Sequence, residues 1–175
     1  MNTLAINRSQ AKEQGFTLVE FVIYVAIFSI IALAIMSFSS AILKPKAKTM
    51  VVTEVDQQGN QYLQILTQTI RNAELVNSPG KGVSASSLSL DVVNVSNDPT
   101  IFDVNSGILQ IKEGAALAVP LTTDRVTVSN LTFKNLTKKR GFGSVRINFT
   151  ITYNNTSGAP EYSYQKDFYA TADLR

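Results

Sequence analysis

The sequence predicts an α+β protein in which a long N-terminal helix is packed on a C-terminal antiparallel β-sheet head. Three observations lead to this prediction. A nearly charge-free apolar run extends from Leu18 to Leu43, apolar residues at helical spacing follow it, and alternation of period two occupies the rest of the chain. The helix is therefore expected to be a transmembrane stem that continues into an amphipathic part.

The apolar run carries a single charged residue, Glu20. Residues 16–43 exceed the length of about 20 residues that a helix needs to cross the hydrocarbon core of a bilayer. We therefore expect one crossing. Its orientation does not follow from charge, because Arg8 and Lys12 before the run are balanced by lysines after it.

Glu20 has two interpretations. Thr17 to Glu20 fit the S/T-x-x-E capping box, in which Thr17 is the N-cap and the Glu20 carboxylate returns to the Thr17 amide. Alternatively, a carboxylate this close to hydrocarbon is costly unless it is paired, and so it marks a place where a cation is delivered. Cleavage after Gly15 would create such a cation, the α-amino group of Phe16. An ordinary secretory signal differs, because its apolar region precedes the cleavage site.

The sequence GFTLVEFVIYVAIFSIIA, which follows a short charged leader, resembles the type III signal of type IV prepilins and of the pseudopilins of type II secretion. Gly15 stands at the last leader position, Phe16 first in the mature chain and Glu20 fifth. The resemblance implies that a prepilin peptidase cleaves after Gly15 and methylates the Phe16 amine. It also implies that Glu20 pairs with the Phe16 amine of a neighbouring subunit while a filament assembles out of the bilayer.

The same resemblance implies the partners and the location of the chain. The partners are other pilin or pseudopilin subunits, the prepilin peptidase, an inner-membrane assembly platform and membrane lipid. Before assembly the chain is expected to be a single-pass protein of the bacterial inner membrane, with the leader cytoplasmic and the head periplasmic or extracellular. The expected domains are a leader peptide at residues 1–15, a transmembrane helical stem at 16–43, an amphipathic helix at 44–76, and a β-rich head at 77–175 packed on 47–76.

The segment after the apolar run reads as an amphipathic helix. Pro45 is expected to break or kink the helix before it resumes. One face of the resumed helix is apolar and the other polar. The apolar positions are Val51, Val55, Tyr62, Leu66, Ile70 and Ala73, and the polar ones are Glu54, Asp56, Gln58, Gln61, Gln64 and Gln68. Gly59 costs about 1 kcal/mol relative to Ala inside a helix, so it indicates a soft point or a close contact.

The remaining sequence alternates as strands do, after a turn at NSPGKG. TIFDV and ILQIK flank Asn105, Ser106 and Gly107 as a hairpin, RVTVSNLTF contains a break near Asn130, and SVRINFTITY is the cleanest strand. One sheet face is expected to cover the apolar stripe of the helix. LQILTQTIRNAELV, LTTDRVTVSNLTF and FYATADLR also resemble J-type minor pseudopilins and W-type minor pilins.

The composition excludes several function classes. The sequence has no Cys and no His, which rules out thiol nucleophiles, imidazole bases and the usual zinc ligand sets. Catalysis by carboxylates alone would require a convergent pair, and the sequence identifies none. We therefore expect no catalytic residue, no metal and no cofactor, and a protein that is not an enzyme.

A basic turn, KKRGFG, is the one candidate for nucleic-acid contact. Lys138, Lys139 and Arg140 could meet phosphates while Phe142 stacks on a base. The alternative is a solvated hairpin loop between a strand ending near Leu136 and one starting at Ser144. Nucleic acid is not expected as the main partner, because the formal charge of the chain is only +3.

The sequence is consistent with three functions. The first is a minor pilin or pseudopilin that is cleaved after Gly15 and assembled through its N-terminal helix into a type IV pilus or a type II secretion pseudopilus. The second is an uncleaved, single-span anchored binding module in which Thr17 and Glu20 only cap a helix. The third is a DNA-uptake pilin that uses the basic turn from Lys138 to Arg140.

Overall fold

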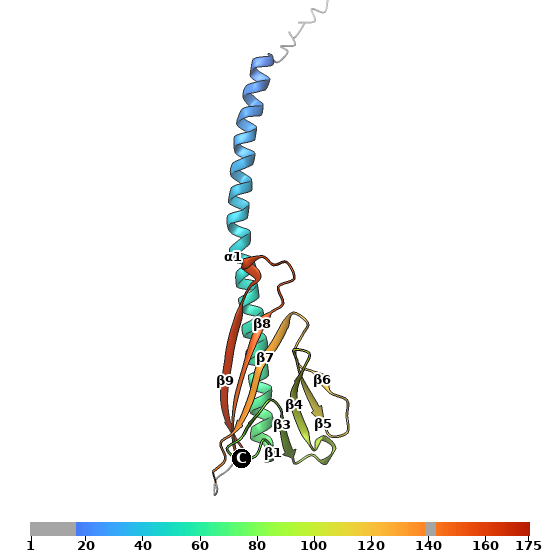
Figure 1. The fold of residues 1–175 in the computed structure, drawn as a ribbon. Coiled ribbons are helices and arrows are strands. Elements are labelled where there is room, and N and C mark those ends of the chain that lie inside the picture. Colours follow the sequence, from blue (N-terminus) through green and yellow to red (C-terminus); the bar gives the residue numbers. More distant parts are fainter. Residues whose placement is uncertain (1–16, 139–142) are drawn as a thin grey trace, which may run out of the picture. The chain divides into compact units, whose positions relative to one another are not determined.

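The structure, a computed structural model, describes residues 17–138 and 143–175 (Figure 1). It has the predicted α+β class, with one long N-terminal helix and two antiparallel sheets. The chain divides into two compact units, Met1–Leu43 and Lys44–Arg175. We describe the first as the stem and the second as the head.

Helix α1 runs from Leu18 to Asn72. The amide of Phe21 donates to the carbonyl of Thr17 at 3.1 Å, so the first turn closes on Thr17. The helix does not break at Pro45, which lies inside it, so of the two expected effects the break is wrong and the kink stays a prediction. A proline costs a helix about 3 kcal/mol. The head outweighs this cost by burying the turns that follow, since tertiary packing supplies most of the stability of a helix in a protein.

The C-terminal end of α1 differs from the prediction. We expected helix through Val76, but α1 ends at Asn72 and Ala73–Ser78 form strand β1. β1 pairs antiparallel with β3 (Leu88–Val92), with Ala73 opposite Val92 and Val76 opposite Leu90. Pairing with β3 provides hydrogen-bond partners for the backbone N–H and C=O groups of β1. In a longer helix, these groups would have bonded within the helix instead.

Two sheets form the head instead of the single sheet that we expected. The first has the order β1-β3-β4-β5-β6, and adds β4 (Thr100–Asn105), β5 (Ile108–Glu113) and β6 (Val119–Pro120) to β1 and β3. The second has the order β2-β7-β8-β9, with β2 (Ser84–Ala85), β7 (Val126–Asn135), β8 (Ser144–Tyr153) and β9 (Gln165–Asp173). Short 3₁₀ turns occupy Val95–Asn97 and Pro160–Tyr162. Pro120 has no backbone N–H and sits in the edge strand β6, so the first sheet is not easily extended there.

The predicted hairpin is confirmed, whereas the irregularity expected near Asn130 is a shift of pairing register inside one continuous strand. β4 and β5 pair with Asn105 opposite Ile108, and the two residues between them have positive φ, 53° at Ser106 and 81° at Gly107. These angles define the type I′ turn that suits the twist of a hairpin. In β7 the pairing with β8 shifts between Ser129 and Thr132, where Asn130 has φ 54°.

The core lies between the amphipathic part of α1 and both sheets. The six predicted apolar positions of the helix are all buried, with at most 2% of each side chain exposed. Five of them, all except Val51, pack in one cluster with residues of both sheets. Those from the first sheet include Leu88, Leu90, Phe102 and Leu109, and those from the second include Phe133, Ile147, Phe149 and Ile151.

Gly59 lies where α1 and β9 are in close contact. A Cβ placed on it would lie only 2.1 Å from Cζ of Phe168 in β9. The Phe168 ring stacks on Phe149, with the ring centroids 5.4 Å apart. The ring therefore lies against the backbone of α1, and the glycine leaves the room that it needs.

Candidate functional site

The start of α1 is the first part of the candidate site. Oγ1 of Thr17 accepts a hydrogen bond from the Glu20 amide at 3.3 Å, as expected of an N-cap. The second bond of a capping box is not made between these two described residues. The Glu20 carboxylate instead accepts a hydrogen bond from the Tyr24 hydroxyl at 3.0 Å. Sequence analysis missed Tyr24, although its position one helical turn after Glu20 was a readable signal.

The apolar surface of the stem is the second part. Among the described residues, α1 holds the one stretch long and apolar enough to cross a membrane, and that stretch is not buried inside the protein. Its large apolar side chains are exposed along its length. They are Leu18, Val19, Phe21, Val22, Ile23, Tyr24, Val25, Ile27, Phe28, Ile30, Ile31, Leu33, Ile35, Met36, Phe38, Ile42 and Leu43. A surface of this kind requires lipid or other apolar helices around it.

Several predicted site residues lie outside the described part of the chain. Gly15 and Phe16, the expected cleavage and methylation positions, are among them. So are Lys139, Arg140 and Phe142 of the basic turn, whereas Lys138 is described and exposed. β7 ends at Asn135 and β8 begins at Ser144, with the two strands antiparallel, so the turn connects a hairpin. Contact of this turn with nucleic acid stays a prediction.

A buried polar cluster joins α1 to the segment before β7, and sequence analysis missed it. We placed Gln58 on the polar face, but its side chain is 6% exposed, so that assignment is wrong. Its Nε2 donates to Oε1 of Glu54 and, at 2.8 Å, to Oγ1 of Thr123. Its Oε1 accepts from the Tyr62 hydroxyl at 2.7 Å and from the Thr123 amide at 3.4 Å. All four hydrogen-bonding positions of the amide are therefore used.

Tyr62 has a perturbed pKa because of this cluster. Burial, followed by the nearby negative charge of Glu54, raises the pKa of Tyr62 to about 12. Arg125 lies 3.7 Å from Glu54 but is largely exposed, so the ion pair contributes little. The raised pKa keeps the hydroxyl protonated and donating to Gln58, which is a structural role and not that of a catalytic base.

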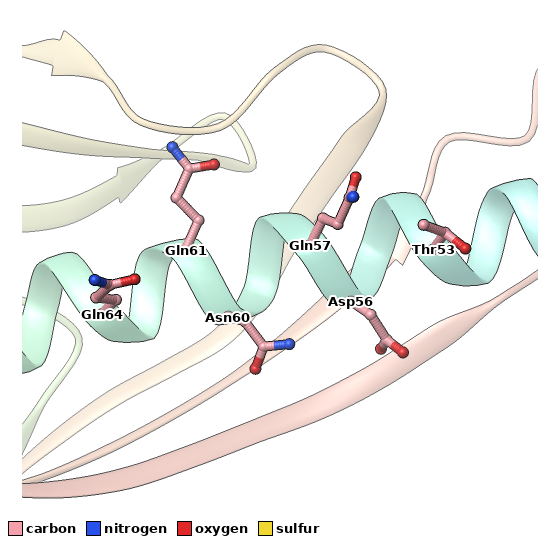
Figure 2. Close-up of a pocket in the computed structure, with 6 residues that line it drawn as sticks. All are labelled: Thr53, Asp56, Gln57, Asn60, Gln61 and Gln64. Atoms are coloured by element: carbon pink, nitrogen blue, oxygen red, sulfur yellow. The ribbon is translucent and has the colours of Figure 1, made fainter.

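No metal-binding group of three or more acidic side chains occurs within residues 17–138 and 143–175. One groove follows α1 itself and is lined by Thr53, Asp56, Gln57, Asn60, Gln61 and Gln64 (Figure 2). Most of its lining side chains are amides. The carboxylate of Asp56 forms an ion pair with Nζ of Lys166 at 2.9 Å.

The comparisons with known proteins bear on the N-terminal part of the chain. Residues 10–42 match the model of the prokaryotic N-terminal methylation motif. No curated protein and no solved structure matched the chain. The motif supports a type IV pilin-like prepilin, and with the apolar helix it fits a single-pass inner-membrane protein. It also suggests a structural role rather than catalysis.

Proposed function

We propose that the chain is a minor pilin or pseudopilin, cleaved by a prepilin peptidase after Gly15 and assembled through α1 into a type IV pilus or a type II secretion pseudopilus. The observation that carries the proposal is the match of residues 10–42 to the methylation motif, in a chain whose apolar helix begins with one carboxylate. Lipid covers the apolar helix before assembly, and the helices of neighbouring subunits cover it afterwards.

In this proposal Glu20 fixes the position of one subunit against the next. Cleavage would free the α-amino group of Phe16, and a neighbour's amine would neutralise the Glu20 carboxylate. Tyr24 already holds that carboxylate from one side at 3.0 Å and leaves it further capacity to accept hydrogen bonds. Removing one partner of a buried ion pair costs about 3–5 kcal/mol, because the remaining charge stays unpaired in an apolar environment.

A second candidate has one observation in its favour. The hydrogen bond between the Glu20 amide and Thr17 is that of an ordinary N-cap, which an uncleaved, single-span anchored binding module would also need. In that module the Glu20 side chain would have no partner subunit. The two candidates therefore differ in processing and in what the carboxylate does.

Coexpression with a prepilin peptidase tests the proposal. We expect the intact mass to fall by the leader and the new N-terminus to be methylated Phe16. An unprocessed chain would favour the anchored module. Glu20→Gln keeps the acceptor for Tyr24 but removes the charge, so it should reduce filament yield while leaving membrane insertion intact, as should Glu20→Val. Glu74→Gln, an exposed carboxylate of β1, is the matched control. Normal filaments from Glu20→Gln would contradict the role of the carboxylate.

A further inference from the structure

Within the described residues, β9 is the one long and regular edge of the two sheets (Figure 1). The other three outer strands are short or irregular. β2 and β6 have two residues each, β6 contains Pro120, and the pairing of β1 with β3 shifts register twice. β9 has nine residues, and all of them pair with β8 without a shift. Proteins commonly shorten, bend or cover the edges of their sheets, so a long regular edge is a surface on which another strand can pair.

The hydrogen bonds on either side of β9 show which of its backbone groups point outward. The Leu174 amide donates to the Gly143 carbonyl at 2.7 Å, and the Tyr164 carbonyl accepts from the Tyr153 amide at 2.9 Å. In an antiparallel pair, residues that bond to the neighbouring strand alternate with residues that do not. The even-numbered residues of this segment therefore bond to β8, and the odd-numbered ones present their N–H and C=O groups to the open edge. These are Gln165, Asp167, Tyr169, Thr171 and Asp173.

The outward backbone groups of these five residues are available for pairing. No residue in 17–138 or 143–175 makes a hydrogen bond to them. The five side chains are exposed as well, and 79% of Tyr169 is accessible to solvent. When an extended segment adds to the edge of a sheet, its main-chain hydrogen bonds supply affinity and alternate side chains supply specificity.

The charges along the edge favour a basic partner. Asp167 and Asp173 lie on the exposed side of the sheet, whereas Lys166 lies on the other side and binds Asp56. Opposite charges on neighbouring strands stabilise their pairing, and like charges oppose it. A second copy of β9 would bring four carboxylates close together at this edge, so the two aspartates disfavour pairing of β9 with itself and favour a strand that carries Lys or Arg.

We propose that β9 pairs with an extended, basic segment of a partner protein, which becomes the fifth strand of the second sheet. On the exposed side the segment places Lys or Arg opposite Asp167 and Asp173 and an apolar residue opposite Tyr169. Its other side chains face the flank of α1, where Figure 2 shows Asp56 and Asn60 pointing to the same side of the helix. Small polar side chains suit that flank. The inference goes beyond the proposed function and does not depend on cleavage of the leader.

A synthetic peptide with these features tests the site. The probe is the fluorescein-labelled peptide TKTTTVTKT, and the protein is the full chain in nonionic detergent micelles. We expect saturable binding by fluorescence anisotropy. Glutamate in place of both lysines should weaken binding by about tenfold, because like charges then face each other. Methylation of the peptide nitrogens at its fourth and sixth residues removes N–H groups that face β9 and keeps the charge, so it should abolish binding.

Two variants of the chain locate the contact. Thr171→Pro removes an outward N–H but no bond to β8, which an edge strand tolerates, so binding should be lost while the fold is kept. The double change Asp167→Lys and Asp173→Lys should transfer binding from the lysine peptide to the glutamate peptide. The matched control, Glu74→Lys with Glu113→Lys, changes two exposed carboxylates of the first sheet and should bind like the parent.

The proposal is overturned if the parent does not bind the peptide, if the methylated peptide binds as well as the unmodified one, or if the double change of β9 does not transfer binding. Parental binding by Thr171→Pro would overturn it too. Leader removal and Phe16 methylation are measured separately, in cells that coexpress the peptidase. A chain that is processed but does not bind the peptide refutes this inference and leaves the proposed function standing.

Discussion

Replacing Gly59 by alanine tests whether a close approach, and not helix flexibility, explains this glycine. Alanine favours an interior helical position by about 1 kcal/mol over glycine, so an open helix would be stabilised. In this chain the new Cβ would lie 2.1, 2.3 and 2.5 Å from three carbons of the Phe168 ring. Phe149 stacks on that ring and Lys166 lies over it at 5.4 Å, so it has little freedom to move away.

Overpacking of this kind typically costs about 1–3 kcal/mol. Subtracting the helical gain of about 1 kcal/mol, we expect Gly59→Ala to lower the free energy of unfolding by up to about 2 kcal/mol. Urea unfolding of the full chain in detergent, followed by the near-ultraviolet circular dichroism of its tyrosines, measures this change. In a Phe168→Leu background the clashing ring atoms are absent, so Gly59→Ala should become neutral or stabilising. An increase in stability in the parent chain would refute the close-contact explanation.

Two other changes test the head by the same unfolding assay. Tyr62→Phe removes the hydroxyl that donates to Gln58 at 2.7 Å, so stability should fall by about 1–2 kcal/mol, whereas the exposed Tyr169→Phe should change it little. Burial and Glu54 raise the pKa of Tyr62 to about 12, so this tyrosine contributes stability below pH 10 that is lost as the pH rises toward 12. The parent should therefore lose more stability than Tyr62→Phe over that range, and equal losses would contradict the assignment. Ser106→Asn should raise stability by several tenths of a kcal/mol, because asparagine tolerates the observed φ of 53° better than serine, and a loss would show that the turn is not limited by its backbone.

The helical stripe was predictable because burial on one side of a helix imposes its period on the sequence. Val51, Val55, Tyr62, Leu66 and Ile70 keep that period and are all buried. The gap of seven residues between Val55 and Tyr62 was the signal that we missed. Position 58 lies three residues after Val55 and four before Tyr62, so it falls on the same helical face. Periodicity alone would therefore have predicted that Gln58 is buried, although its side chain is polar.

The helix limits and the second sheet depend on contacts that a local pattern does not contain. Pro45 is tolerated because of packing that begins several residues later, which no local rule includes. Ala73 continues the apolar stripe of the helix, yet its backbone pairs with Val92. The division into two sheets depends on which distant strands meet. Alternation identified the strands, but it carried no information about their partners.

For the candidate site, the sequence was informative because the signal is a short linear motif. Gly15, Phe16 and Glu20 are recognised by their order along the chain, so no fold is needed to find them. The hydrogen bond from Tyr24 to Glu20 could have been predicted from helical geometry alone, because the two residues are four positions apart.

The glutamines of α1 show how one residue type serves two environments on one helix. A charged side chain in place of Gln58 would be buried beside Glu54 and Tyr62, whereas an apolar one would leave the Tyr62 hydroxyl and Thr123 without their partner. Outside, Gln57, Gln61 and Gln64 are exposed, and water can supply hydrogen bonds to the same kinds of donor and acceptor. A neutral side chain that both donates and accepts therefore suits the buried position 58 better than either a charged or an apolar one.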